Sequence, residues 1–334
     1  MIKSYISAIE YYLPDGKDFN DPNDRLTHKI GIMTKNIAAE DEFASDLAYY
    51  SAMKIFNNGK ANPDDIDFLL YCTQSPDYIL PTTACLLQER LGLPTSCGAL
   101  DFNLGCSGFV YGLSLAKGLI ESGMAKNVLL LTADTYSKYI NPNDRSVQLL
   151  FGDAASATLI SGKEGEGDED FIGSFVFGTD GKGADNLIIH AGGLKEPLTA
   201  SSYEEIQDDH GNLRSRSNLY MNGNEIFNFA SKEVPKAINK VLEKSNLSID
   251  QVDYFVFHQA NQYMLETLRR KIGIKSEKFS IQFADCGNTV SSTIPIALIR
   301  DFQEEKCSNG DNIVLVGFGV GYSWASCVIK LNLK

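Results

Sequence analysis

The amino-acid sequence predicts a layered α/β fold, because two kinds of segment alternate along the chain. Segments with apolar residues at helical spacing alternate with short, continuously apolar segments that are typical of buried strands. In GFVYGLSLAKGLI, for example, Phe109, Leu113, Ala116 and Ile120 share one helical face. Predicted helices cover 44–56, 83–93, 108–120, 225–247, 262–273 and 293–305, and predicted strands cover 67–72, 98–103, 126–134, 252–259 and 312–318.

Two pairs of similar segments indicate that the chain consists of duplicated halves. NVLLLTAD in the first half is similar to NIVLVGFG in the second, and FGDAAS is similar to FGVGYS. Between these pairs, residues 161–222 are polar and rich in glycine, which is typical of a boundary and of loops that cover a site. We therefore predict one half at 1–165 and the other at 166–334.

Composition excludes several classes of function. The net charge is -13, which argues against a nucleic-acid-binding face. No run of eighteen apolar residues occurs and the N-terminus lacks an apolar signal core, so we expect a cytoplasmic protein without a membrane partner. The seven cysteines are scattered singly, with no CxxC pair, so we predict neither a disulfide framework nor a metal site.

Cys106 stands where a predicted strand turns into a predicted helix, in the segment DFNLGCSGFVYG. Gly105 allows the sharp turn, so the cysteine lies at or beside the helix N-terminus. Unpaired N–H groups and the positive end of the helix dipole stabilise a thiolate in such a position. We therefore predict that Cys106 is a nucleophile. The alternative is a structural cysteine in a tight turn.

His258 follows the apolar strand VDYFVF together with Gln259 and Asn261. Ligands bind at the carboxyl ends of strands in open α/β sheets, so this polar cluster is a candidate site. Two of the other three histidines lie in polar, loop-like segments, whereas His190 ends the strand-like LIIH and is the competing candidate. We favour His258 because its whole polar cluster follows a buried strand.

Asn288 lies in DCGNTVSSTIPIAL, where a glycine-containing turn again leads into a helix. An asparagine in this position serves either as a helix N-cap or as a functional amide, and the segment alone does not separate the two. Cys286 is a rival nucleophile, but it lies upstream of the helix start.

The segment GFGVGYSW places Gly317, Gly319 and Gly321 directly after an apolar strand. A dinucleotide-binding loop is excluded because only thirteen residues remain, and they alternate like a strand. A glycine turn between two strands fits better. Such a turn points backbone N–H groups at an oxyanion.

Together these segments resemble the beta-ketoacyl-acyl-carrier-protein synthase III family, condensing enzymes of the thiolase superfamily that start fatty acid synthesis. The resemblance extends over essentially the whole chain. Its motifs are GCSGF around Cys106, FGDAASA near Asp153, NGNEIF at 222–227, HQAN at 258–261, GNTVSSTIP at 287–295 and GFGVGYSW at 317–324. The family implies a homodimer and a thiolase-like five-layer α-β-α-β-α fold, with the nucleophile in the first half and the histidine and asparagine in the second.

The resemblance also implies a mechanism without a metal or redox cofactor. Cys106 takes an acyl group from acyl-CoA, and the N–H groups of Cys106 and Val320 form the oxyanion hole. Malonyl-ACP (ACP, acyl carrier protein) then enters, and His258 and Asn288 hold its thioester carbonyl while carbon dioxide leaves. The resulting carbanion attacks the acyl-cysteine and yields 3-oxoacyl-ACP.

Further residues take roles by their positions in the family pattern. Phe227 and Leu80 line the acyl pocket, with Leu80 coming from the partner subunit. Arg25 and Lys29 stand where the family carries a tryptophan and an arginine that hold the CoA adenine. The cations that would dock the acidic carrier protein are Arg269, Arg270 and Lys271, although a solvated helix end is an equally simple interpretation.

Residue types separate the chain from related enzymes. Hydroxymethylglutaryl-CoA synthases need a glutamate before the nucleophile, where this chain has Gln74, which cannot exchange a proton. Elongation synthases have a second histidine where this chain has Asn288. Thiolases have a second cysteine in the last glycine-rich loop, where this chain has Val320.

Two rival hypotheses remain. The first is a specialised acyltransferase of a polysaccharide or secondary-metabolite pathway, which passes the acyl group to a non-malonyl acceptor. The second is a non-catalytic carrier-binding or scaffold protein. The presence of cysteine, histidine and asparagine together argues against the second.

Overall fold

The computed structural model describes residues 1–165 and 170–333. A five-stranded sheet is built by the first half of the chain. In order across the sheet, its strands are β1 (Ile2–Tyr12), β7 (Ala154–Glu164), β6 (Asn127–Asp134), β4 (Phe68–Cys72) and β5 (Gly98–Phe102). β4 runs parallel to β5 and β6, whereas β7 is antiparallel to both β6 and β1.

The second half builds a four-stranded sheet of matching topology. Its strands, in order, are β13 (Tyr254–Phe257), β14 (Asn312–Gly319), β15 (Ser323–Lys330) and β8 (Ile172–Thr179). β13 and β14 are parallel, whereas β15 is antiparallel to both β14 and β8. The strands β4, β6, β7 and β1 of the first sheet pair in the same parallel, antiparallel, antiparallel order. A parallel bridge between Phe255 and Phe279 takes the place of the pairing between β4 and β5. The predicted duplication is thereby confirmed.

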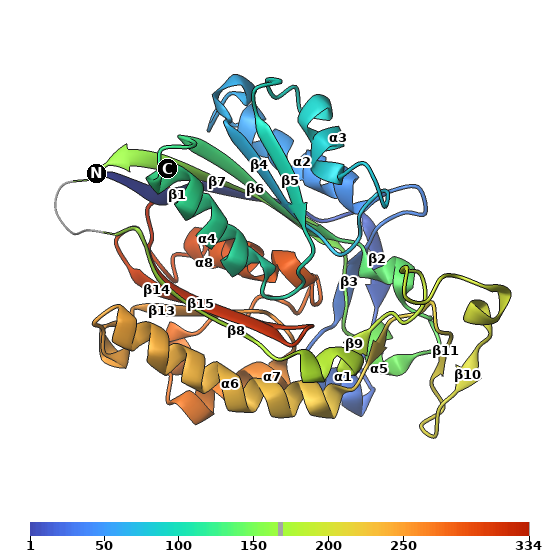
Figure 1. The fold of residues 1–334 in the computed structure, drawn as a ribbon. Helices are drawn as coiled ribbons and strands as arrows, with labels where there is room; N and C mark the ends of the chain where they lie inside the picture. The colour runs from blue at the N-terminus through green and yellow to red at the C-terminus, as the bar shows by residue number, and fades with distance from the viewer. Residues whose placement is uncertain (166–169, 334) are drawn as a thin grey trace.

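The helices complete five layers (Figure 1). α2 (Ala44–Asn57) and α3 (Thr83–Arg90) cover the outer face of the first sheet. α4 (Gly108–Glu121) and α8 (Thr293–Gln303) lie between the two sheets, and α6 (Gly223–Lys244) and α7 (Gln262–Ile272) cover the outer face of the second. The thiolase-like α-β-α-β-α arrangement that the sequence predicts is confirmed.

The layered arrangement explains why the segment that forms β6 is continuously apolar. β6 is covered on both faces, so its residues from Val128 to Asp134 are all buried. α4 is wedged between the sheets and approaches β6 closely at Gly112, where a side-chain Cβ would lie 2.6 Å from a Leu130 methyl group. A larger residue at this position would push the helix away from the sheet.

Residues 161–222 contain more regular structure than the sequence indicates. β7 continues to Glu164, and β8 is a full strand of the second sheet because its edge position tolerates glycine and partial exposure. The predicted boundary between 165 and 166 adjoins residues that lie outside the described part of the chain. Short elements complete the fold: β2 (Gly16–Phe19), β3 (Thr34–Ile37), β9 (Leu187–Ile188), β10 (Ile206–Gln207), β11 (Leu213–Arg214), β12 (Tyr220–Met221), α1 (Arg25–Ile30) and α5 (Arg145–Gln148).

Seven short 3-10 helices are found in the described residues. They are η1 (Pro63–Asp65), η2 (Tyr136–Tyr139), η3 (Gly181–Asn186), η4 (Ala200–Tyr203), η5 (Ile249–Gln251), η6 (Ser276–Lys278) and η7 (Val290–Ser292). Within 1–165 and 170–333, no helix has both the length and the apolar character needed to cross a bilayer.

Candidate active site

Cys106 lies in the turn between β5 and α4, two residues before the helix begins at Gly108. The backbone N–H groups of Cys106 and Val320 both lie close enough to its sulfur to lower the pKa of the thiol. The strand β14 passes directly beside this turn. A Cβ on Gly319 would lie 2.8 Å from the Cys106 sulfur, so the approach requires glycine.

The electrostatic environment of Cys106 differs from the one expected at a helix start. Burial raises the pKa of the thiol to about 12, and the carboxylate of Asp134 acts in the same direction. The two backbone N–H groups act against these effects but do not overcome them. The expectation of a stabilised thiolate is therefore wrong for the resting protein, in which burial keeps Cys106 a neutral thiol.

His258 follows β13 and is held from two sides. Its backbone N–H donates to the Val316 carbonyl at 2.8 Å, and its Nδ1 lies 2.7 Å from the Thr293 hydroxyl. The ring meets the edge of Phe318, with centroids 5.6 Å apart. Burial lowers the pKa of His258 to about 3, so the imidazole is neutral at physiological pH.

Asn288 joins the two halves of the fold. Its backbone N–H donates to the Leu150 carbonyl at 2.9 Å, and its carbonyl accepts the Gly152 N–H at 3.1 Å. Its side-chain Oδ1 accepts the Val290 N–H at 3.0 Å, which leaves the Nδ2 donor for the cavity that the side chain lines. The N-cap alternative is wrong, because α8 begins at Thr293 and its N-cap is Ser292.

Cys106, His258 and Asn288 line one narrow cavity of about 70 Å³. The structure thus brings together the three residues that the sequence selects from separate segments. The rivals Cys286 and His190 do not line this cavity. Cys286 is buried against backbone carbonyls of Gln282 and Gly287, and burial raises its pKa to about 12.

A route leads from this cavity to the surface through two larger spaces. The middle space, of about 480 Å³, shares Met221 and Met264 with the cavity at Cys106. The outer space, of about 840 Å³, shares Lys29 and Tyr263 with the middle one. Adjoining spaces of this kind suit a long, narrow ligand arm that extends from the surface toward the sulfur.

The residues assigned to the pocket and to CoA lie at different depths. Arg25 and Lys29 both line the outer space. The Lys29 ammonium lies 4.3 Å from the ring centroid of Tyr263, and Phe227 stacks on the same ring at 5.4 Å. Phe227 thus lines the middle space and not the cavity at Cys106, while Leu80 is 79% exposed and lines none of the three.

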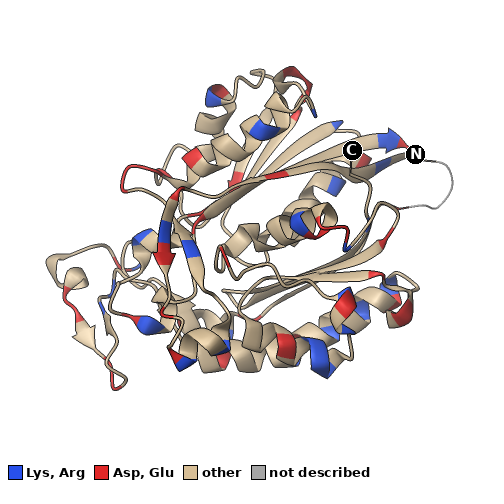
Figure 2. Ribbon diagram, turned by 180° about the vertical axis from the view of Figure 1, so that it is seen from behind, with Lys and Arg blue, Asp and Glu red and all other residues tan. Residues whose placement is uncertain are grey.

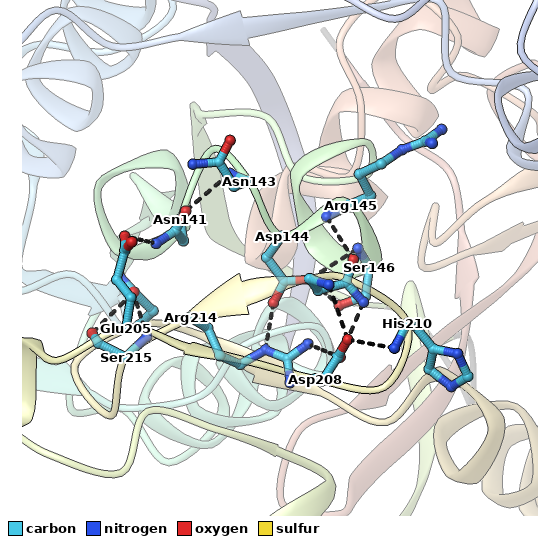
Figure 3. A network of polar contacts seen from close by, with 12 residues as sticks. Asn141, Asn143, Asp144, Arg145, Ser146, Glu205, Asp208, His210, Arg214 and Ser215 are labelled. Atoms are coloured by element: carbon cyan, nitrogen blue, oxygen red, sulfur yellow. Dashed lines mark hydrogen bonds and ion pairs between the residues drawn. The ribbon is translucent and has the colours of Figure 1, made fainter.

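Arg145, His210 and Tyr263 also line the outer space, and sequence reasoning missed them. His210 comes from the β10–β11 hairpin, which is anchored to the turn before α5 (Figure 3). Arg214 forms ion pairs of 2.6 Å with Asp144 and with Asp208. The glycine-rich stretch indicates loops over a site, but no local pattern distinguishes these three side chains from other surface residues.

The three cations assigned to carrier docking differ in how many protein groups bind them. Arg269 is bound to Glu266 and to the Ile274 carbonyl, and Lys271 donates to the Ser231 carbonyl. The Arg270 side chain is 76% exposed and lies 3.5 Å from Glu266. Both signs of charge occur on the outer helices α6 and α7, as Figure 2 shows. Arg269 is therefore the most constrained of the three cations, whereas Arg270 and Lys271 are exposed.

Gln74 lies directly beside the Cys106 turn. Its side-chain Nε2 donates to Asn103 at 2.9 Å, and its Oε1 accepts from the Tyr136 hydroxyl. A Cβ on Gly105 would lie 2.5 Å from this Oε1. Within 1–165 and 170–333, no three His, Cys, Asp or Glu side chains are grouped as metal ligands.

Two family models match the chain. The model for 3-oxoacyl-[acyl-carrier-protein (ACP)] synthase III matches residues 100–181, and the model for its C-terminal part matches residues 242–331. These two segments contain Cys106, His258 and Asn288.

Curated relatives are similar over the full length. A beta-ketoacyl-[acyl-carrier-protein] synthase III of Clostridioides difficile is 36% identical, with 99% of each chain covered. A second, from Halalkalibacterium halodurans, is 35% identical over 98% of this chain and 96% of that protein.

Solved structures agree with these relatives. A crystal structure titled 3-oxoacyl-(acyl-carrier-protein) synthase III is 49% identical, with a TM-score of 0.96 and coverage of 98% and 100% of the two chains. The corresponding structure from Burkholderia xenovorans is 36% identical, with a TM-score of 0.89 and coverage of 99% and 95%. With this fold, this cavity and these relatives, the chain belongs to the 3-oxoacyl-[acyl-carrier-protein] synthase III family and is a condensing acyltransferase.

Proposed function

We propose that the chain catalyses the decarboxylative condensation of an acyl-CoA primer with malonyl-ACP. The observation that carries this proposal is the convergence of Cys106, His258 and Asn288 on one cavity, with two N–H groups directed at the sulfur. The cavity lies at the inner end of a route that suits a pantetheine arm. No metal or redox cofactor takes part in the proposed reaction.

The first half-reaction forms an acyl-cysteine. The Cys106 sulfur attacks the thioester carbonyl, its proton passes to the departing CoA sulfur, and free CoA leaves. The N–H groups of Cys106 and Val320 hold the oxyanion that forms on the carbonyl oxygen. They are backbone groups in two tight turns, one before α4 and one between β14 and β15, so they need no reorganisation as the charge develops.

The second half-reaction forms the new carbon–carbon bond. Malonyl-ACP loses carbon dioxide, and the charge that develops on its thioester oxygen is held by His258 and by the Asn288 Nδ2 donor. The carbanion attacks the acyl-cysteine carbonyl and displaces the cysteine sulfur, which takes up a proton. The products are 3-oxoacyl-ACP, carbon dioxide and the free thiol. Hydrogen bonds in a buried site stabilise such developing charge effectively.

Substrate binding is assigned to the outer space and to α7. Arg25 and Lys29 lie where they would contact the phosphates or the base of CoA, and Arg270 would contact the acidic carrier protein. We further propose a homodimer in a cytoplasmic setting. β5 lies at the edge of its sheet, and the nearby segment exposes Ile79 at 92% and Leu80 at 79%.

Intact-mass spectrometry after incubation with acyl-CoA and acyl-ACP donors tests the first half-reaction. We expect an acyl adduct on the native chain and none on Cys106→Ala. Release of labelled carbon dioxide from malonyl-ACP tests the second. An adduct that forms without carbon dioxide release in the presence of malonyl-ACP would favour the specialised acyltransferase, and an adduct on Cys106→Ala would refute the site.

A further inference from the structure

A buried carboxylate lies behind the catalytic cavity and has no part in the chemistry described so far. Asp134 ends β6 and its side chain is fully buried. Its Oδ1 accepts the backbone N–H of Gln74 at 2.8 Å. Its Oδ2 accepts the backbone N–H of Ser291 at 3.3 Å and also the Ser291 hydroxyl. The two oxygens thus hold segments from the two halves of the fold.

The Gln74 contact supports the turn that carries the nucleophile. Gln74 follows β4, and its side chain packs so closely on the turn that a Cβ on Gly105 would lie 2.5 Å from its Oε1. The same side chain is fixed by hydrogen bonds to Tyr136 and Asn103. The backbone position of Gln74 therefore sets one wall against which the Cys106 turn rests.

The Ser291 contact supports the loop that orients the other two catalytic groups. In this loop the Val290 N–H holds the Asn288 amide, and the Thr293 hydroxyl holds the His258 ring. Val290 is β-branched, yet its φ is 53°, in the left-handed region. A β-branched residue keeps such a conformation only where surrounding contacts hold it. The hydrogen bonds from Ser291, the next residue, to Asp134 are such contacts.

The carboxylate is costly for folding, which makes its presence informative. Burial raises the pKa of Asp134 to about 7, and its hydrogen-bond donors within the described residues, the N–H groups of Gln74 and Ser291 and the Ser291 hydroxyl, are all uncharged. A buried carboxylate without a cation opposes folding, and perturbed groups of this kind cluster at functional sites. The titratable groups that interact with it are Tyr71, Cys72, Cys106, Tyr136, Tyr139 and Asp153.

We propose that Asp134 is a positioning residue. It fixes the loop that bears Asn288, together with Thr293, which holds His258, in the correct position relative to the Cys106 turn. The proposal rests on the proposed function, because it assigns the residue to the condensation step. Acylation needs the sulfur and the two backbone N–H groups, whereas condensation also needs Asn288 and His258. Loss of this relative position should therefore slow condensation more than acylation.

Asp134→Asn and Ser291→Ala test this assignment, with the two half-reactions measured separately. For Asp134→Asn we expect acylation within about threefold of the native rate and a fall in kcat for condensation of about thirtyfold or more, with KM for malonyl-ACP nearly unchanged. Ser291→Ala should show a smaller loss with the same selectivity. The double variant should lose less than the two single losses combined, since the residues act as one pair.

A pH profile separates positioning from a purely structural role. In the native enzyme, condensation should rise as Asp134 ionises near pH 7, and this rise should be absent from Asp134→Asn. Asp153→Asn is the matched control, because Asp153 is a buried carboxylate that binds the Ala38 and Ser137 backbone instead. Its losses should fall equally on both half-reactions.

The outcomes are distinguishable. Equal losses in acylation and condensation for both Asp134→Asn and Ser291→Ala, or no loss of condensation in either, would overturn the assignment. If Asp134→Asn fails to fold, Ser291→Ala alone decides, because it removes one hydroxyl and keeps the backbone contact. A native enzyme that neither forms the adduct nor releases carbon dioxide would instead refute the proposed function.

Discussion

At the scale of single residues, burial governs the chemistry of the site more than charge does. Burial raises the pKa of Cys106 and lowers that of His258, so both rest in their neutral forms. In the reaction that we propose, reactivity then comes from groups placed in advance in the cavity: two backbone N–H groups, the imidazole and one amide. Because the cavity is closely packed, the addition of a single methyl group is enough to displace these groups.

Gly319→Ala should block acylation. The added methyl group would lie 2.8 Å from both Cβ and Sγ of Cys106, where no carbon fits without displacing the sulfur. We expect acyl-cysteine formation to slow by at least about a hundredfold, or about 2.7 kcal/mol in activation free energy. Rapid-quench mass spectrometry measures this rate.

Gly118→Ala is the control for that substitution. Gly118 lies within α4 and a Cβ there would have no neighbour within 4 Å. Alanine favours the helix, so the melting temperature should stay or rise slightly while acylation is unchanged. Native acylation by Gly319→Ala would contradict the geometry of the sulfur.

The neutral state of His258 predicts a dependence of stability on pH. Its pKa is about 3 in the folded chain and ordinary in the unfolded chain, so the unfolded chain binds more protons between these values. The free energy of unfolding should therefore fall as the pH decreases below about 6.5. Replacement by glutamine removes this contribution.

Urea unfolding of the native chain and His258→Gln at pH 5 and pH 8 measures the effect. We expect the native chain to lose about 1 to 2 kcal/mol more than the variant on going from pH 8 to pH 5. Asp134 acts in the opposite direction, because its raised pKa favours folding at low pH, but it is present in both proteins. Equal pH dependence of the two proteins would show that His258 is not buried in its neutral form.

At the scale of elements, the ends of strands and helices bring the site together. β13 and β14 end directly before His258 and Val320, the turn after β5 carries Cys106, and the loop before α8 carries Asn288. α1 and α7 contact each other at the outer space through Lys29 and Tyr263. Arg270 and Lys271 at the basic end of α7 are both exposed, but Lys271 is bound to the Ser231 carbonyl, so carrier docking is predicted to depend on Arg270.

Arg270→Glu should weaken carrier binding. We expect KM for malonyl-ACP to rise by about five- to tenfold, while acylation from acyl-CoA stays unchanged, because the change removes an attraction that precedes the chemistry. The effect should shrink at high salt. Steady-state kinetics with both substrates provides the measurement.

Lys240→Glu on α6 is the control, since it makes the same change of charge at another exposed position on the same outer layer. An equal rise in KM for this variant would mean that net charge, and not a docking position, determines the effect.

At the scale of the whole molecule, the duplicated halves place the site at their junction. Cys106 comes from the first half and His258 and Asn288 from the second, and Asn288 pairs with residues 150–152 across the junction. The segment with Ile79 and Leu80 remains apolar and exposed in the single chain. A partner subunit is the simplest cover for such a segment.

Leu80→Asp should weaken the homodimer. A charge at this position would be buried in the interface that we propose, so the dimer should dissociate at lower protein concentration. Sedimentation velocity over a range of concentrations measures this change. Met124→Asp, at a site 69% exposed after α4, should leave assembly unchanged. A native chain that is monomeric at all concentrations would refute the dimer.

The sequence by itself determined the layered fold and the duplication, and it selected three residues that the structure places around one cavity, because apolar periodicity and strand-end motifs are local signals. Other features depend on tertiary packing. β8, the contribution of Arg145, His210 and Tyr263 to the outer space, and the burial that raises the pKa of Cys106 were decided by which segments pack together. Asp134 illustrates the reason most clearly, since nothing in NVLLLTAD shows that the chain buries its last residue between two halves. Burial is a property of the folded molecule, and it sets both pKa values and contacts.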